Sequence, residues 1–340
     1  MRNIGKYYAL ISGDMIDLAR AEVESLLNMI GNRCIVDWRG RLAVISSDHD
    51  PTDFLLQRAS FARAVGEILF TCDRHGPVSS DALSAALRPD QTFRIDVIAQ
   101  DHRVSSSEKK ELIMKWGRSV HEATGGTVNL ESPNARFALL VDDDHLMFCR
   151  YHESHLRREL RSRLASKKPF FHPSMMNSVV ARALCNLGLL RAGEVLLDPF
   201  CGAGGILCEA ALMGAYVVGI DSNPRLLRGA RMNLASQCST NSTLILGDSR
   251  FIPISGVSLV VTDPPYGRTS STRGHDAVGL VRRFFAQTDD ILVCGGRVCI
   301  CADSEMNIGD ILDTMGMPVE LRVKVPVHAG LCREIFRVRI

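Results

Sequence analysis

Apolar residues recur along the chain at two spacings, and these spacings predict where helices and strands lie. In the first 60 residues, YYALIS at 7–12 is typical of a strand, and DLARAEVESLLNMI at 17–30 has apolar residues at helical spacing. Two further short strands flank Arg39–Gly40, and another helix follows Pro51. This pattern indicates an α+β region without nucleotide-binding glycines.

A second unit begins after about residue 63. It reads EILFTCD as a strand, SSDALSAAL as a helix and FRIDVIAQ as a strand. A long helix is predicted over roughly 105–123, and TVNLESP, FALLVD and LMFCRY follow as strands. This unit also has an α+β pattern.

The stretch 150–172 differs in charge from its surroundings. Over 150–168 it carries two acids, Glu153 and Glu159, and seven cations: Arg150, Arg157, Arg158, Arg161, Arg163, Lys167 and Lys168. One interpretation is a solvated linker. The other is a connector that contacts phosphates, because clustered cations bind polyanions by releasing counterions.

From residue 174 onward, buried apolar strands alternate with helices. A helix at about 174–190 precedes EVLLD, YVVGI follows as the next strand, and TLILGD, VSLVVTD and RVCICAD supply further strands. This alternation predicts a largely parallel, doubly wound sheet. The segments LRVKVPV and EIFRVRI, separated by a polar turn, predict a closing antiparallel hairpin.

Composition limits the classes of protein that fit. The 340 residues are enough for two domains, and the net charge of +2 requires any nucleic-acid partner to bind a local patch. No apolar stretch reaches the roughly 18 residues of a membrane span, and the first residues lack a signal peptide's apolar region, so we expect a cytosolic protein. The eleven cysteines form no CxxC pair and the ten histidines no HxxxH pair, so we expect buried thiols, including Cys299 and Cys301, and no metal site.

A glycine-rich turn follows the strand EVLLD and reads DPFCGAGG, from Asp198 to Gly205. Gly202 and Gly204 let the backbone approach a ligand closely where a strand gives way to a helix. A nicotinamide fingerprint would read GxGxxG, but position 207 is leucine and an acid precedes the loop. We therefore favour S-adenosylmethionine over a dinucleotide.

Acids at successive strand ends support this cofactor. The amino and sulfonium groups of S-adenosylmethionine favour a carboxylate at Asp198, and its ribose diol favours Asp221 at the end of the second strand. Asp248 follows the third strand, where it is placed to accept the adenine amine. Each acid alone is also typical of a helix cap or turn, but three at successive strand ends favour a ligand site.

The stretch Thr262–Gly267 reads TDPPYG and follows an apolar strand, and its two prolines prevent the strand from continuing. An exocyclic amine on a nucleobase is a poor nucleophile, so an enzyme that methylates it must orient the nitrogen lone pair. Asp263 and the carbonyl of Pro264 are suited to accept the two N–H groups. The ring of Tyr266 is suited to stack on the base, which is worth about 1–3 kcal/mol.

DPPYG resembles the amino-methyltransferase signature, and its combination with DPFCGAGG resembles guanine-N2 RNA methyltransferases. The segments KPFFHPSMMNSVVARALCNL, GGILCEAALMGAYVVGIDSNPRLLRGARMNL, TDPPYGR and VHAGLCREI are similar to the archaeal THUMP-domain tRNA (guanine(10)-N2)-dimethyltransferase family. FRIDVIAQ, GGTVNLESP, FALLVDD and LMFCRYH resemble a THUMP domain, an RNA-binding module that grips the 3′ end of tRNA. The first 60 residues match that family's ferredoxin-like leader loosely.

The resemblance implies a class I Rossmann-like methyltransferase, with a mostly parallel sheet and a C-terminal hairpin, preceded by an α+β ferredoxin-like/THUMP region. The implied parts are a ferredoxin-like region, a THUMP domain, a basic linker and a methyltransferase domain, at 1–62, 63–152, 153–173 and 174–340. The residues implied to line the S-adenosylmethionine pocket are Asp198, Phe200, Gly202, Gly204, Asp221 and Asp248. Those implied to hold the guanine are Asp263, Pro264 and Tyr266. His172 and Arg268 are implied as RNA or loop contacts, with ordinary surface positions as the alternative.

The activity implied is transfer of one or two methyl groups from S-adenosylmethionine to the exocyclic N2 of guanosine 10 in tRNA. Neither DNA nor a membrane is an expected partner, and a small activating partner protein stays an open alternative. Ribosomal RNA as the substrate and a non-catalytic RNA-binding assembly factor also stay open. Adenine-N6 methylation of DNA fits less well, because those enzymes carry target-recognition regions and must flip the base out of a duplex.

Overall fold

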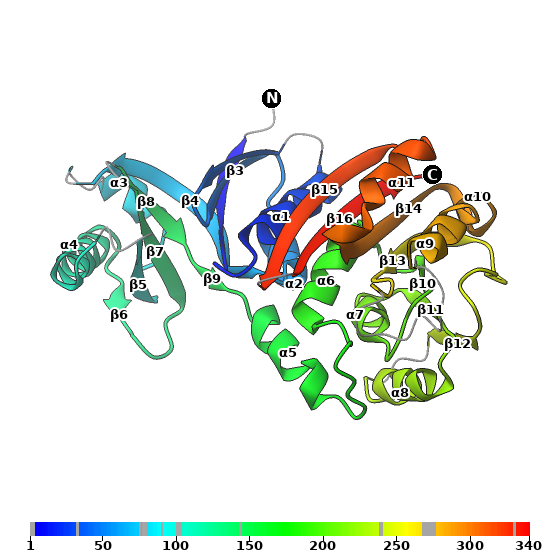
Figure 1. The fold of residues 1–340 in the computed structure, drawn as a ribbon. Helices are drawn as coiled ribbons and strands as arrows, with labels where there is room; N and C mark the ends of the chain where they lie inside the picture. The colour runs from blue at the N-terminus through cyan, green and yellow to red at the C-terminus, as the bar shows by residue number, and fades with distance from the viewer. Residues whose placement is uncertain are drawn as a thin grey trace. The chain divides into compact units, whose positions relative to one another are not determined.

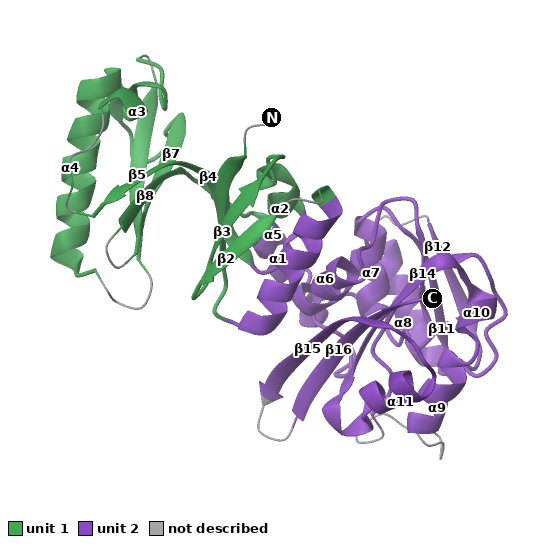
Figure 2. Cartoon of the chain, turned by 90° about the horizontal axis from the view of Figure 1, so that it is seen from above, with its two compact units in different colours: residues 1–13, 30–57, 62–155 green, residues 14–29, 58–61, 156–340 purple. Residues whose placement is uncertain are grey.

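The computed structural model describes residues 4–31, 34–74, 76, 80–89, 91–99, 104–142, 145–237, 241–266, 277–328 and 331–340. The chain forms two compact units, shown in different colours in Figure 2. Unit 1 comprises residues 1–13, 30–57 and 62–155, and unit 2 comprises residues 14–29, 58–61 and 156–340. The division does not follow chain order, because one N-terminal helix belongs to unit 2.

Unit 1 is built on one large sheet with the strand order β2-β3-β1-β4-β8-β7-β5-β6 among its described strands, and β9 pairs with β4. The elements in chain order are β1 (Gly5–Ile11), β2 (Ile35–Arg39), β3 (Leu42–Ser47), α2 (Thr52–Arg58), β4 (Ala62–Asp73), α3 (Ser80–Ser84), β5 (Thr92–Ala99), α4 (Ser106–Thr124), β6 (Thr127–Val128), β7 (Ala135–Val141), β8 (His145–Arg150) and β9 (His152–Glu153). The strand β4 joins the two halves of the sheet, since it pairs with β1 over its first part and with β8 over its second.

The first half of this sheet has a ferredoxin-like topology. Its strands lie in the order β2-β3-β1-β4, and neighbours are antiparallel, as in a β-α-β-β-α-β chain. In the second half, α4 covers one face of the sheet with an aromatic core in which Trp116 stacks on Phe148 at 5.3 Å between ring centroids. The strand expected at TVNLESP is only two residues long, because the Asn129 side chain accepts hydrogen bonds from the backbone of Glu131 and Ser132 and forms a turn.

Unit 2 contains the predicted doubly wound sheet, visible in green to red in Figure 1. Its elements in chain order are α1 (Ile16–Ile30), α5 (Leu156–Ser162), a 3₁₀ turn η1 (Ala165–Lys167), α6 (Ser178–Leu187), β10 (Val195–Asp198), α7 (Gly205–Leu212), β11 (Tyr216–Asp221), α8 (Pro224–Ala235), β12 (Ser242–Leu246), β13 (Val257–Thr262), α9 (Ala277–Phe285), α10 (Thr288–Ile291), β14 (Leu292–Asp303), η2 (Ser304–Met306), α11 (Ile308–Thr314), β15 (Val319–His328) and β16 (Leu331–Arg339).

The strand order of this sheet is β12-β11-β10-β13-β14-β16-β15. The strands from β12 to β14 are parallel, and the predicted hairpin β15–β16 adds antiparallel to β14. Leu259 and Cys299 lie close to Gly188 at the end of α6, whereas Val260 and Val298 belong to a core with α9–α11, so helices cover both faces. The chain reverses its direction of winding between β10 and β13, which makes this the point where such folds bind ligands.

A buried carboxylate attaches the N-terminal helix α1 to unit 2. Glu22 is fully buried and accepts hydrogen bonds from the backbone of Ser60 and Phe61, from the Ser60 hydroxyl and from the amide of Asn186 on α6. The same Asn186 accepts a hydrogen bond from Arg58 at 3.1 Å. The segment that contains α1 therefore belongs to the second core through a network that no local pattern reveals.

The basic stretch contains a short helix. This helix, α5, was not expected from the sequence. It forms because Leu156 and Leu160 lie one helical turn apart and are both buried. The next helix, α6, begins later than expected, since the side chain of Asn177 caps it by accepting from the Val179 backbone at 2.8 Å.

The described cysteines are all free thiols. Cys299 and Cys301 are buried on β14, as expected for a core strand, but Cys294 on the same strand is exposed. None of the described helices combines the length and the apolar character needed to cross a membrane.

Replacing Glu22 by alanine tests the network that holds α1. The change leaves buried donors on Ser60, Phe61 and Asn186 without an acceptor, so we expect the free energy of unfolding to fall by at least about 3 kcal/mol. Urea unfolding followed by circular dichroism measures it. The matched control is Glu24→Ala on the exposed face of the same helix, which we expect to change stability by less than about 0.5 kcal/mol. Equal losses in both variants would contradict the role of the network.

Candidate active site

The predicted acids of unit 2 lie along one edge of its sheet. Asp198 and Asp221 are the last residues of β10 and β11, Asp263 directly follows β13, and Asp248 lies two residues after β12. Because these strands are parallel and β10 lies between β11 and β13, their carboxyl ends meet at the same edge. The fold therefore brings both predicted motifs to the point where the sheet changes its direction of winding.

Asp198 lies buried beneath the glycine loop, with 2% of its surface exposed. Its Oδ1 accepts hydrogen bonds from the hydroxyl of Thr262 at 2.7 Å and from the backbone N–H of Phe200 at 3.1 Å. Burial, with a smaller contribution from Asp263 and Asp221, raises the pKa of this carboxyl to about 7, although the hydrogen bonds from Thr262 and Phe200 lower it. A cationic ligand group beside Asp198 would favour the ionised form.

The glycine loop is held against Asp221. The Gly202 N–H donates to Oδ2 of Asp221 at 2.9 Å, and the Asn223 N–H donates to Oδ1 at 2.7 Å. Gly202 and Gly204 have φ angles of +53° and +78°, which side-chain-bearing residues rarely adopt. A Cβ at Gly202 would meet nothing within 4 Å, so this position faces open space. The loop thus presents its backbone to any ligand at the sheet edge.

Two other predicted cofactor residues are placed with less constraint. Phe200 is partly exposed next to Asp198. Asp248 accepts hydrogen bonds from its neighbour Arg250, whose Nε lies 3.0 and 2.9 Å from the two carboxylate oxygens. An adenine amine would share this carboxylate with the guanidinium, so the assignment of Asp248 to adenine stays a prediction.

The turn after β13 brings Asp263 and Tyr266 into direct contact. The hydroxyl of Tyr266 donates a hydrogen bond to Oδ1 of Asp263, and Pro264 between them is buried. Burial raises the pKa of Asp263 to about 6, while the guanidinium of Arg333 and the hydrogen bond from Tyr266 lower it. At neutral pH this carboxyl is therefore mostly ionised and suited to accept an N–H group.

Arg333 is a site residue to which the sequence analysis gave no role. It lies on β16, and its Nη2 is 3.6 Å from Oδ2 of Asp263. The stretch VHAGLCREI contains it and was part of the family resemblance, but only the register of the closing hairpin shows that this arginine reaches the TDPPY turn.

The two candidates for RNA or loop contacts fare differently. The ring nitrogen Nδ1 of His172 lies 2.7 Å from the Ser174 hydroxyl in a local turn, so the structure shows a partner within its own segment. Arg268 lies outside the described residues, as does Gly267 at the end of the TDPPYG motif.

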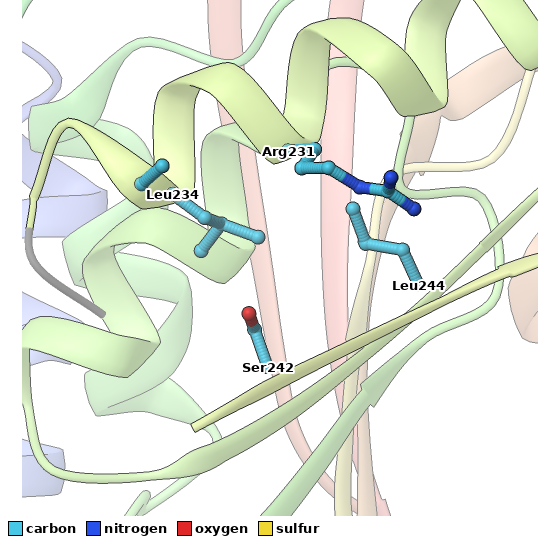
Figure 3. A pocket seen from close by; sticks show the side chains of 5 residues that line it. Arg231, Leu234, Ser242 and Leu244 are labelled. Atoms are coloured by element: carbon cyan, nitrogen blue, oxygen red, sulfur yellow. The ribbon is translucent and has the colours of Figure 1, made fainter. Parts of the chain in front are cut away.

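A separate pocket of about 260 Å³ lies between α8 and the edge strand β12 (Figure 3). It is lined by Arg231, Leu234, Ala235, Ser242 and Leu244. Ser242 begins β12 and Ala235 ends α8, so the pocket lies toward the amino ends of the strands. None of the predicted site residues lines it, and it is not the ligand site at the carboxyl edge.

Comparison with known proteins agrees with this geometry. The family described as RMKL-like, methyltransferase domain, matches residues 165–334. The chain is 30% identical over 337 residues to the tRNA (guanine(10)-N2)-dimethyltransferase of Methanothermobacter thermautotrophicus, covering 96% of this chain and 97% of the relative. It is 33% identical over 233 residues to the protein of the same name from Pyrococcus abyssi, covering 67% and 69%.

Among solved structures, TrmN from Thermus thermophilus superimposes with a TM-score of 0.54 at 21% identity, covering 98% of this chain and 99% of that one. This likeness shows a shared fold, in agreement with the predicted Rossmann-like methyltransferase class. The match over nearly the full length of a curated relative extends the similarity to both units. The chain therefore belongs to the RMKL-like methyltransferase family and, within it, to the tRNA (guanine(10)-N2)-dimethyltransferases.

Proposed function

We propose that this protein transfers methyl groups to the exocyclic N2 of guanosine 10 in tRNA. The observation that carries the proposal is the hydrogen bond between Thr262 and Asp198, which joins the TDPPY turn to the acid before the glycine loop. This contact supports the proposal, because the residues that would hold an amine then lie next to those that would hold a methyl donor. The curated relatives named as tRNA (guanine(10)-N2)-dimethyltransferases supply the substrate class.

The methyl donor is S-adenosylmethionine, as the methyltransferase domain implies. It supplies an electrophilic methyl group on a sulfonium. The site's residues fit this cofactor. Asp198 is a buried carboxylate suited to its cationic end, and the backbone at Gly202 faces open space and leaves room for it. Asp221 accepts the Gly202 N–H and is suited to the ribose diol. The assignment of these individual residues rests on their chemistry and placement.

The chemistry at the base follows from the poor nucleophilicity of its amine. In our proposal, Asp263 and the carbonyl of Pro264 accept the two N–H groups of N2, which turns the nitrogen lone pair toward the methyl group. Bound S-adenosylmethionine would supply the methyl group, with the electron pair of the broken C–S bond returning to sulfur, and the methylated amine would lose one proton to solvent. A carboxylate offers about four acceptor positions, so Asp263 accepts from both Tyr266 and the amine.

We propose that residues 63–152 bind the tRNA as a THUMP domain, and we keep the expected boundaries 1–62, 63–152, 153–173 and 174–340. Several cations of unit 1 form ion pairs, among them Arg74 with Glu108 and Arg136 with Asp96 and Glu153. The helix α4, in contrast, exposes Lys110, Met114 and Arg118 one turn apart on its outer face. This line of two cations around an apolar side chain supports a nucleic-acid contact.

We also propose that part of the basic stretch after unit 1 contacts phosphates. Its Arg157 and Arg163 are paired with Asp14 and Glu209, and Lys168 is buried. Arg158 and Arg161 on α5 are exposed. Lys167 of the same stretch is exposed too, but Arg158 and Arg161 lie together on one helix, so these two are our candidates for RNA contacts.

Replacing Asp263 by asparagine tests the catalytic assignment. The amide keeps the size of the side chain but loses its negative charge, so we expect methyl transfer to slow by about a hundredfold or more while tRNA affinity stays near that of the wild type. The assay is transfer from labelled S-adenosylmethionine to unmodified tRNA transcripts, with nucleoside analysis. Asp290→Asn, an exposed acid on α10, is the control.

Near-normal turnover of this variant would overturn the assignment of Asp263. The same assay on ribosomal-RNA fragments and DNA tests the substrate, since label there would contradict tRNA as the partner. Full turnover by the purified chain alone would contradict the need for a small activating partner.

Replacing Asp198 by asparagine tests its role in binding S-adenosylmethionine and, separately, its effect on the stability of the protein. The amide oxygen still accepts from Thr262 and Phe200, but the charge is lost, so we expect affinity for S-adenosylmethionine to fall about tenfold to a hundredfold. The pKa of Asp198 in the folded protein is about 7, above its ordinary value, so the wild type loses stability as pH rises from about 4 through 7. We therefore expect the ligand-free variant to be more stable than the wild type at pH 8.

Calorimetric titration with S-adenosylmethionine and urea unfolding at pH 5 and pH 8 measure the two effects. Asp290→Asn again serves as the control for loss of one charge. Unchanged cofactor affinity would contradict the placement of the cationic end at Asp198.

Neutralising the exposed cations of α5 tests the proposed RNA contact. We expect Arg158→Gln/Arg161→Gln to weaken tRNA binding and to reduce the slope of log affinity against log salt by about two, while the rate at saturating tRNA is unchanged. The measurement is filter binding over a range of salt. Arg282→Gln/Arg283→Gln, on the exposed face of α9, removes the same charge elsewhere. An equal loss in this control would show that α5 has no special role.

A further inference from the structure

The closing hairpin of unit 2 delivers one arginine to the proposed amine site. Arg333 lies on β16, where it is in register with Asp303 of β14 and Val325 of β15. Only 23% of its side chain is exposed. The guanidinium nevertheless stays protonated, and so positively charged, at all ordinary pH values. A cation in such a place needs a physical reason, because taking a charge out of water is costly unless it is paired.

Three contacts account for the position of this guanidinium. Nη2 lies 3.6 Å from Oδ2 of Asp263, the guanidinium carbon lies 5.8 Å from the centroid of the Tyr266 ring, and Nη1 donates to the sulfur of Met176 at 3.6 Å. Met176 in turn packs on the first residue of α7, since a Cβ at Gly205 would lie 3.0 Å from its carbonyl oxygen. Arg333 therefore touches the two side chains of the TDPPY turn and the segment behind the glycine loop.

Arg333 interacts with Asp263 through its charge and not through a hydrogen bond. At 3.6 Å the nitrogen lies beyond the 2.7–3.2 Å of an ordinary N–H···O bond. The guanidinium thus stabilises the carboxylate electrostatically without occupying the acceptor positions that an amine needs. Lying within about 6 Å of the Tyr266 centroid, it also interacts with that ring.

The other groups that face Asp263 make this cation important. Asp198 of β10 is a second acid close by, Tyr266 donates its hydroxyl, and Cys301 of β14 is a buried thiol. Burial disfavours a charged Asp263 and raises its pKa, whereas Arg333 and the hydrogen bond from Tyr266 lower it. Among these groups Arg333 is the one that carries a positive charge.

We propose that Arg333 is a positioning residue for methyl transfer, which keeps Asp263 ionised and holds Tyr266 so that the turn accepts the target amine. This inference rests on the proposed function, because it requires Asp263 to accept an N–H group of N2. Contact with an RNA phosphate is the competing use of an arginine here. It disagrees with the burial of Nε, which has no hydrogen-bond partner among the described residues and is covered by protein.

The test is the pH dependence of a single turnover at saturating S-adenosylmethionine and tRNA, for wild type, Arg333→Gln and Arg333→Lys. Saturation with the cofactor keeps Asp198 ionised, so the acid limb of the rate reports Asp263. We expect Arg333→Gln to move this limb up by about one pH unit, at the lower end of the effect of an opposite charge at this distance. The rate above that limb stays within a few fold of wild type. Arg333→Lys restores the charge and moves the limb back toward wild type.

Arg339→Gln is the matched control, because Arg339 lies on the same strand and pairs with Glu320, away from the turn. We expect its acid limb and rate to match the wild type. Cofactor affinity and thermal unfolding of each variant are measured alongside, and Arg333→Met, which also removes the charge, carries the comparison if Arg333→Gln does not fold.

Three outcomes would overturn the inference. An unmoved acid limb with a lower plateau would give Arg333 a structural role only. Weakened tRNA binding with a reduced salt slope and an unmoved limb would make it a phosphate contact. An equal shift in Arg339→Gln would make the effect one of net charge. Failure of the proposed function is distinguishable, because the wild type would then transfer no methyl group to tRNA at any pH.

Discussion

The hydrogen bond between Thr262 and Asp198 is the interaction on which the arrangement of the site depends. It joins the ends of β13 and β10, two strands that are distant in sequence but adjacent where the sheet changes its direction of winding. Thr262 is fully buried, so its hydroxyl needs a partner, and the carboxylate needs a donor for the same reason. The bond satisfies both groups and sets the TDPPY turn beside the glycine loop.

Unit 2 buries several carboxyl groups, and the groups that compensate for the loss of water differ from one to the next. Glu22 is surrounded by neutral donors, which tie α1 to the core. Glu209 on α7 is paired with Arg163 and Arg182 and is purely internal. Asp198 and Asp263 keep pKa values raised to about 7 and about 6, because their environment compensates burial only in part. Incomplete compensation at the sheet edge leaves these two acids responsive to a ligand, as is typical of functional sites.

The helix α1 lies early in the chain but belongs to unit 2. The strand order of the first 73 residues is ferredoxin-like. The first helix of this segment, α1, nevertheless belongs to unit 2 together with the doubly wound sheet. Ser25 on that helix accepts a hydrogen bond from Arg337 of β16, which also bonds to Leu187 of α6. Removing the N-terminal segment would therefore expose buried polar groups of the methyltransferase core, so the two parts are not separable at a single point along the chain.

Local features of the fold could be predicted from the sequence alone. Apolar periodicity placed most strands and helices, because a period of two or of 3.6 depends on near neighbours alone. It also placed Asp198, Asp221, Asp248 and Asp263 after strands, and the alternation of strands and helices implied one common edge. The strand predicted at TVNLESP is shorter than expected, because the Asn129 side chain forms a turn with its neighbours.

Features that depend on residues far apart in the chain could not be predicted in this way. The pairing of β16 with β14 brings Arg333 to Asp263, and the burial of Leu156 and Leu160 stabilises the helix α5 within the basic stretch. The docking of α1 depends on Asn186, which lies 164 residues after Glu22. Charge compensation acts through space, so the sequence shows which side chains carry charge but only the fold shows which of them meet.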